Sequence, residues 1–340
     1  MFHTVICDVL RIRYPILQGA MQGGGGVELV AAVSNAGGLG VLPTYGAPDH
    51  KLRASIAAVR ALTDRPFGVN IMPMGRGITE QCAATCIELG VPIVTTGRAD
   101  PGPDVVRRLK AAGIKVVSVI PTVEHARRME AEGVDALVAS GTEAGGHVGT
   151  VATLPLVPQV VDAVRIPVLA AGGIGDARGF LAAFALGAVG VQMGTRFMAT
   201  VESDLDAAGR ARLLAMHETD TIVTRVLTGA TVRCIRTPEI VAYEEGLAAH
   251  ASDEVMAQLK RRVRAARTTG DRSGGDGGEA AVAARGDPGG EAGGEGGSRT
   301  SAAGQIGGMI HDVPTVRELI ESMLAQASRM AQALPALAQR

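Results

Sequence analysis

Short runs of β-branched and other apolar residues alternate along this chain with longer amphipathic stretches, and the alternation occurs eight times. The apolar runs predict strands at residues 15–18, 39–42, 68–71, 93–95, 115–119, 136–139, 168–170 and 190–193. The stretches between them predict helices, for example at residues 28–36, 104–112, 123–131 and 176–186. Asp104 and Asp176 stand where N-caps are expected, which supports two of these helix starts. The first 200 residues therefore form a regular strand–helix repeat.

A strand–helix repeat of this kind predicts an α/β fold, with a parallel sheet that helices cover. Eight repeats favour closure into a TIM (β/α)8 barrel over an open doubly wound sheet. In a barrel, the functional residues are expected at the carboxyl ends of the strands.

The pattern changes after about residue 200. Residues 206–216 and 244–267 have helical periodicity, whereas residues 268–304 are rich in glycine and lack an apolar pattern. We expect a barrel over 14–200, a helical extension over 201–267, a low-complexity disordered insertion over 268–304 and a C-terminal helix over 305–340 that returns to the barrel. The Gly-rich tract thus interrupts a C-terminal helical appendage as a flexible insertion.

Composition narrows the range of partners. The 340 residues carry 33 Lys and Arg against 34 Asp and Glu, and the chain has five Phe, three Tyr and no Trp. A near-neutral chain with so few aromatic residues predicts no nucleic-acid partner and no membrane partner. Charged residues near the N-terminus argue against a signal peptide, and four scattered cysteines suit buried thiols, so a cytoplasmic location is expected. A homodimer is left open.

The expected strand ends carry neutral hydrogen-bonding side chains. They are Gln18, Gln22, Asn70, Thr95 and Thr96. Such amides and hydroxyls suit a polar heterocycle such as a flavin, whereas a metal site would need clustered carboxylates and histidines, so no metal is expected. Glycine pairs or single glycines follow the last two strands, at Gly172, Gly173 and Gly194, where barrels often bind a phosphate.

Among the seven histidines, His147 stands apart because it ends a glycine-rich loop after the sixth barrel strand. An imidazole at a strand end can face a ligand and titrates near neutral pH. We therefore predict that His147 is catalytic or orients the substrate, with Glu143 in the same loop as its brace.

The motifs PILQGAMQGGGGVELVAAVSNAGGLGVL, FGVNIM, VTTGRADP, GTEAGGHVG, AAGGIGD and VQMGTRF resemble those of the nitronate monooxygenases, and the flavin-dependent enoyl-acyl-carrier-protein reductases share them. The resemblance implies a TIM barrel that binds FMN. It implies that Ala20, Met21 and Gln22 contact the flavin, that Asn70 hydrogen-bonds it and that Gly146 lines it. It also implies a cofactor-binding segment at Ala171, a phosphate site at Gly172, Gly173, Gly194 and Thr195, and His147 as the active-site histidine.

Three positions depart from the family pattern. The glycine run at 23–26 replaces an aromatic residue, which predicts an open wall on the substrate side. Some nitronate monooxygenases have a lysine at the position of Val119. The valine here resembles the reductase branch instead. Arg98 could attract an anion at the mouth of the site, or it could be a loop arginine paired with Asp100.

The first function hypothesis is an FMN-dependent nitronate monooxygenase, which oxidises alkyl nitronates with dioxygen to carbonyl compounds and nitrite. The alternative is an NAD(P)H-dependent FMN enoyl-acyl-carrier-protein reductase, whose small-molecule substrate is an enoyl thioester. A flavin-binding scaffold without activity is the third, and the intact His147 loop argues against it.

Overall fold

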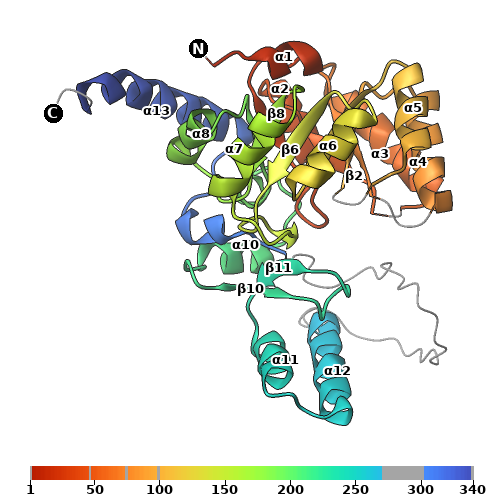
Figure 1. Cartoon of the computed structure of the whole chain (residues 1–340), viewed down its shortest axis with the longest axis vertical. Helices are drawn as coiled ribbons and strands as arrows, with labels where there is room; N and C mark the ends of the chain where they lie inside the picture. The colour runs from red at the N-terminus through yellow and green to blue at the C-terminus, as the bar shows by residue number, and fades with distance from the viewer. Residues whose placement is uncertain (1, 46, 73–75, 98–99, 270–301, 338–340) are drawn as a thin grey trace.

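Eight parallel strands form a nearly closed barrel in the computed structural model, which describes residues 2–45, 47–72, 76–97, 100–269 and 302–337 (Figure 1). Around the sheet, the hydrogen-bonded order is β1-β9-β8-β6-β5-β4-β3-β2. The strands are β1 (Ile16–Gln18), β2 (Val41–Pro43), β3 (Gly68–Ile71), β4 (Ile93–Thr96), β5 (Lys115–Ile120), β6 (Ala136–Ser140), β8 (Val168–Ala171) and β9 (Val191–Met193). The predicted TIM barrel is confirmed, and each strand lies within two residues of its expected bounds.

A glutamine side chain helps to close the barrel between its first and second strands. Backbone pairing at this seam is limited to the bridge between Leu17 and Leu39 and its neighbours. Beyond the bridge, the Gln18 amide oxygen accepts from Val41 N at 3.0 Å and its amide nitrogen donates to Val41 O at 3.3 Å. Gln18 is fully buried, and so it acts as part of the β1–β2 ladder.

Helices cover the outer face of the barrel. They are α2 (Val27–Asn35), α3 (Asp49–Leu62), α4 (Arg76–Glu88), α5 (Pro103–Ala111), α6 (Val123–Ala131), α7 (Thr153–Ala163), α8 (Ala177–Ala185) and the C-terminal α13 (Val316–Leu337). Asp176 caps α8 as expected, because its carboxylate accepts from the amides of Arg178 and Gly179. The expected cap at Asp104 is wrong: α5 begins at Pro103 after Gly102, and Asp104 pairs with Arg107 in its first turn.

Two apolar layers hold the barrel together. The outer layer lies between strands and helices, and α13 joins it through Val316, Ile320 and Met323. The inner layer fills the barrel with side chains from alternate strand positions, such as Leu17, Val117 and Leu169. A short N-terminal helix, α1 (Val5–Leu10), packs onto this inner layer, so the chain closes the amino end of its own barrel.

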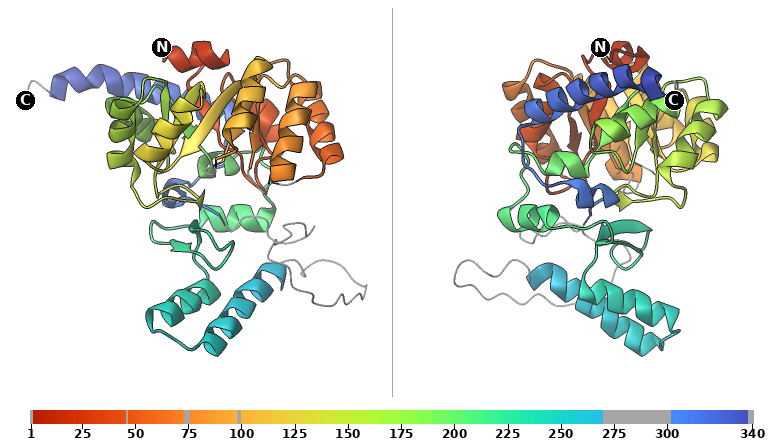
Figure 2. Two further views of the ribbon diagram at one scale, coloured as in Figure 1. Left: turned by 45° about the vertical axis from the view of Figure 1, so that its right-hand side comes forward. Right: turned by 90° about the vertical axis from the view of Figure 1, so that its left-hand side faces the viewer.

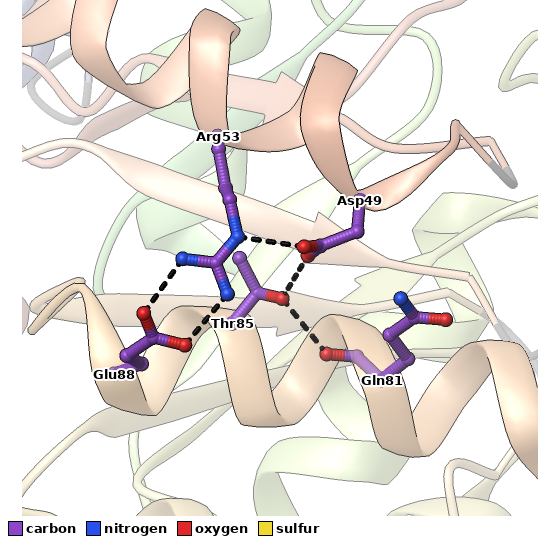
Figure 3. Close-up of polar contacts among 5 residues, drawn as sticks. All are labelled: Asp49, Arg53, Gln81, Thr85 and Glu88. Carbon is purple, nitrogen blue, oxygen red and sulfur yellow. Dashed lines mark hydrogen bonds and ion pairs between the residues drawn. The ribbon is translucent and has the colours of Figure 1, made fainter.

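An ion network joins two neighbouring outer helices (Figure 3). Arg53 on α3 bonds Asp49 at 2.6 Å and makes a two-point contact with Glu88 on α4 at 2.7 and 2.6 Å. The Thr85 hydroxyl on α4 also reaches the Asp49 carboxylate, and this bond, together with Arg53, lowers the Asp49 pKa. The network fixes α3 against α4 on the barrel exterior and lies apart from the strand ends.

The chain after the barrel forms a smaller unit at the carboxyl ends of the strands (Figures 1 and 2). It contains α9 (Thr195–Met198), α10 (Ala207–Leu214), β10 (Thr221–Thr224), β11 (Val232–Ile235), α11 (Pro238–Ala248), α12 (Asp253–Thr269) and the 3-10 turn η1 (Gln305–Met309). The expected helical extension therefore also contains two strands. The single helix expected over 244–267 is two antiparallel helices, because the chain reverses between Ala248 and Asp253.

Most of the expected insertion over 268–304 lies outside the described residues, as does Arg98. The four cysteines are buried, and burial raises the pKa of the Cys86 thiol to about 12. In the described ranges, no helix has both the length and the apolar character of a membrane span.

Candidate active site

One cavity of about 680 Å³ lies at the carboxyl ends of the barrel strands. All eleven residues that the sequence singled out as catalytic or cofactor-binding line it: His147, Ala20, Met21, Gln22, Asn70, Gly146, Ala171, Gly172, Gly173, Gly194 and Thr195. They come from the ends of five different barrel strands or the loops after them, so the barrel topology brings them together.

The ends of β8 and β9 offer a group of free backbone donors. Gly172 and Gly173 have φ angles of 96° and 72°, a region that residues with a Cβ rarely adopt. Among the described residues, the N–H groups of Gly172, Gly173 and Gly194 donate to no protein acceptor. Backbone N–H groups left open on one cavity wall match the acceptor oxygens of a phosphate. These residues therefore fit the phosphate end of a cofactor.

The amide and hydroxyl groups that the sequence grouped together do not all reach the cavity. Asn70 and Thr95 line it, and Asn70 Nδ2 donates to Thr95 Oγ1 at 2.9 Å. That bond orients the Asn70 carboxamide. Gln18 instead closes the barrel seam, and the Thr96 hydroxyl donates to Ser118 at 2.9 Å. Both are buried in the wall behind the cavity.

The His147 loop is held by a strand from the smaller unit. Residues Gly146–His147 form a short strand, β7, which pairs antiparallel with β11, with His147 opposite Val232. His147 is half-buried, and its Nε2 lies 3.4 Å from the Thr228 hydroxyl on the β10–β11 loop. The smaller unit thus fixes the backbone of His147 and supplies a polar neighbour to its ring.

A buried arginine supports the same loop. Arg233 on β11 donates from Nε to the Thr142 carbonyl at 2.7 Å and from Nη1 to the Thr221 hydroxyl at 2.8 Å. Its side chain is almost fully buried, and this burial lowers its pKa, although the nearby Glu143 charge acts in the opposite direction. The sequence pattern marked neither Arg233 nor Thr228, since their contacts with the loop cross about 80 to 90 residues.

Glu143 connects the loop to the next helix. Its carboxylate accepts from the amide and the hydroxyl of Thr153, all at 2.9 Å, at the start of α7. The returning segment seals this region: Gln305 N donates to Glu143 O at 2.9 Å, and Gly304 N donates to Thr195 Oγ1 at 2.9 Å. A Cβ on Gly304 would lie 2.7 Å from Glu143 O, so this close approach requires glycine.

The cavity wall also contains an aromatic side chain that the sequence did not single out. Tyr45, on the loop after β2, lines the cavity, and its hydroxyl lies 3.5 Å from Ala20 O. Its φ angle of 37° is unusual for a bulky residue, and burial raises the pKa of the phenol. Tyr45 therefore adds an aromatic side chain to the cavity wall beside Ala20, in the loop that leads to residues 23–26.

Asp100 in the fourth loop bonds a residue of α6, while the expected pair with Arg98 lies outside the described residues. Its carboxylate pairs with Arg128 Nε on α6 at 3.2 Å and accepts from Gly102 N at 2.7 Å. It also lies against Glu132. Burial of Glu132, followed by repulsion from Asp100, raises the Glu132 pKa to about 7.

We expect Glu132→Gln to stabilise the protein at pH 8 by about 1 kcal/mol, discounted for partial exposure, and to have little effect at pH 4. The folded state keeps a proton on Glu132 up to about pH 7, whereas the unfolded chain loses it near pH 4.5. Stability therefore falls as pH rises through this window, and the amide removes that loss. Thermal unfolding at both pH values tests this. The control Glu124→Gln, exposed on the same helix, should show no such pH dependence.

Comparisons with known proteins give relatives along the whole chain. The model of a family described as nitronate monooxygenase matches residues 3–326. A "(3aS,4S,5R,7aS)-5-hydroxy-7a-methyl-1-oxo-octahydro-1H-indene-4-carboxyl-CoA dehydrogenase" of Rhodococcus jostii is 34% identical over 352 residues, which cover 98% of each chain. A "probable nitronate monooxygenase" of Staphylococcus aureus is 37% identical over 274 residues, 68% of this chain and 77% of that protein. The structure of FabK from Thermotoga maritima covers 99% of this chain and 100% of its own, with 36% identity and a TM-score of 0.84.

Proposed function

The chain belongs to the nitronate monooxygenase family of oxidoreductases, and from that premise we propose that it binds FMN and transfers hydride between the flavin and the acyl chain of a thioester. In the direction of reduction, NAD(P)H would provide the hydride and a 2-enoyl thioester would accept it. This is the second of the two reactions that the sequence suggested. Oxidation of an alkyl nitronate by dioxygen is the other candidate.

Flavin binding is typical of the family, and the cavity fits FMN in two respects. The open N–H groups of Gly172, Gly173 and Gly194 would hold the phosphate. Asn70, with Ala20, Met21 and Gln22 from the loop after β1, would contact the ring system. When bound, FMN supplies the group that accepts and returns a hydride.

The observation that carries the choice of a thioester is the charge and size of the cavity. Among its described lining residues, Tyr45, Glu143 and His147 are the only ones with an ionisable side chain, and none is a lysine or an arginine. A nitronate is an anion, and an anion held away from water needs a cationic partner. A neutral acyl chain needs none. The cavity, which FMN would share with the substrate, also reaches from the strand ends to Leu227 and Thr228, and this extension suits a ligand longer than a small nitroalkane.

The relatives support the same choice. The Rhodococcus protein that matches this chain end to end is named as a dehydrogenase of a carboxyl-CoA compound. The Staphylococcus protein named for nitronate oxidation matches a shorter share of the chain. The β10–β11 loop, which completes the cavity wall here, and the α11–α12 hairpin thus belong to the length shared with the CoA-named relative.

In the proposed reduction, a hydride goes to the β-carbon of the enoyl thioester and a proton goes to the α-carbon. His147 is the proton donor, because it is the one imidazole among the described residues that line the cavity, and imidazole is the side chain that most often serves as a general acid. The Thr228 hydroxyl, 3.4 Å from Nε2, orients the ring. Tyr45 and the β10–β11 loop, which line the cavity, would shield the bound substrate from water.

One specific observation keeps the nitronate reaction as a second candidate. A protonated His147 could hydrogen-bond the nitronate oxygens, and the family model and the Staphylococcus relative both carry that name. The reaction would yield a carbonyl compound and nitrite with consumption of dioxygen.

Rapid mixing of the purified holoprotein separates the two reactions. The flavin absorbance near its visible maximum is followed after anaerobic mixing with NADH, NADPH or ethyl nitronate in parallel, and the reduced protein is then mixed with crotonyl-CoA or with dioxygen. We expect fast reduction by a nicotinamide and fast reoxidation by crotonyl-CoA. Reduction by ethyl nitronate alone, with reoxidation only by dioxygen, would replace the proposal with the nitronate reaction.

A further inference from the structure

The helix α12 carries a cluster of positive charge that the barrel does not use. Lys260, Arg261, Arg262 and Arg264 are all exposed on its carboxyl-terminal half. In the described part of the chain, none of these four side chains forms an ion pair. The carboxylates of the α11–α12 hairpin lie elsewhere along it, at Glu239, Glu244, Glu245, Asp253 and Glu254.

The position of this basic cluster connects it to the active site. Val263 lies within the cluster and is buried against Val226 and Cys234 of the β10–β11 unit. Leu227, the neighbour of Val226, packs on the same apolar group and also lines the cavity. The apolar group that holds the carboxyl-terminal half of α12 therefore shares Leu227 with the cavity wall, and Figure 1 shows the carboxyl end of α12 as the end nearest the barrel.

Helix stability does not explain the cluster. Cations stabilise a helix through its dipole only within the last turn. α12 continues to Thr269, so Lys260 and Arg261 lie about two turns before its end. Like charges at Lys260 and Arg264, four residues apart on one helix, repel each other and cost a little stability. A group of four cations without ion pairs, kept despite this repulsion, is typical of a site that binds a polyanion.

Resting on the thioester function above, we propose that the α12 cluster binds the phosphates of the nucleotide part of coenzyme A, so that the substrate is an acyl-CoA. The nucleotide carries a 3′-phosphate and a diphosphate, which match separate guanidinium and ammonium groups. Its pantetheine arm would run along the β10–β11 loop, whose residues Leu227 and Thr228 line the cavity, and would bring the acyl group to His147. An acidic carrier protein is the competing partner.

Binding of the nucleotide alone tests the site without any reaction. Isothermal titration of the holoprotein with 3′-phosphoadenosine 5′-diphosphate should give binding that weakens on the order of tenfold in Lys260→Gln/Arg264→Gln, because each lost partner of a phosphate removes a charge-assisted contact. The matched control is Arg317→Gln/Arg329→Gln on α13, which removes the same charge from exposed positions on the far side of the barrel. The control should bind as the unmodified protein does.

Kinetics with crotonyl-CoA and crotonyl-pantetheine complete the test. Lys260→Gln/Arg264→Gln should raise KM for crotonyl-CoA on the order of tenfold, with little change in kcat, and should leave KM for crotonyl-pantetheine unchanged. An equal KM for both substrates in the unmodified protein, or unchanged nucleotide binding in the variant, would overturn the proposal. A crotonyl carrier protein used in preference to crotonyl-CoA, with the same dependence on α12, would also overturn it in favour of a protein partner.

These outcomes are separate from failure of the proposed reaction. If the nucleotide binds through α12 but no thioester reoxidises the flavin, the α12 site stands and the reaction is wrong. If thioesters react but the nucleotide contributes nothing, the reaction stands and the α12 site is wrong.

Discussion

His147→Ala is expected to retain its flavin and to lose turnover on the order of 10²-fold or more, the usual scale for a positioned acid or base. The imidazole lies on the cavity wall beside the Thr228 hydroxyl, and its backbone is fixed by the β7–β11 pair. Removing the ring therefore removes the proton donor and leaves the loop in place. The measurement is kcat for reduction of crotonyl-CoA, with flavin content read from the visible spectrum.

Two further variants show whether the loss is chemical. His217→Ala changes an exposed histidine outside the cavity lining and should leave kcat unchanged. Thr228→Val removes the hydroxyl beside the ring but keeps the shape, and it should lower kcat less than His147→Ala does. If His147→Ala turns over at the rate of the unmodified protein with full flavin content, the proton for the α-carbon comes from another group.

Gly194→Leu is expected to purify without flavin and to bind added FMN at least on the order of tenfold more weakly. The φ angle at Gly194 is −114°, which any residue adopts, so a side chain there does not strain the backbone. A Cβ would make an ordinary contact with Met21 Sδ at 3.4 Å, and a longer side chain would have to enter the cavity where the phosphate is proposed to lie. Fluorescence titration of the apoprotein with FMN gives the affinity.

Gly194→Ala is the matched control, because its methyl group fits beside Met21 and should leave most of the affinity. Gly172 is a weaker test, since a Cβ there would lie 2.8 Å from Thr153 Oγ1 and the substitution would disturb the fold itself. Thermal unfolding of both Gly194 variants separates loss of flavin from loss of structure. Full flavin content in a stable Gly194→Leu protein would show that the phosphate does not lie at the end of β9.

The sequence alone determined the barrel and the residues around its cavity. Each strand is a short apolar run whose period and flanking glycines are local properties, so its position follows from a few neighbouring residues. Once eight parallel strands close, their carboxyl ends must lie on one face. That is why residues as distant as Ala20, His147 and Gly194 line a single cavity, as their places after strands indicated.

Other features depend on contacts between distant residues, which no local pattern contains. Gln18 was expected near a flavin, but its partner at Val41 makes it part of the barrel seam. The turn between α11 and α12 contains no proline that would mark it in the sequence. Val263 of α12 and Ile240 of α11 meet in one buried apolar group, and this contact holds the two helices side by side. Only the tertiary structure decided these points, because burial and partner choice outweigh local preference there.

The support of His147 was also decided by the tertiary structure. The β11 strand that pairs with it and the Arg233 side chain that bonds Thr142 follow the loop by about 85 to 90 residues. Gly304 then returns from beyond the glycine-rich tract to bond Thr195. The sequence placed a histidine at a strand end through local pattern, whereas the groups that orient it come from chain segments that meet only when the fold is complete.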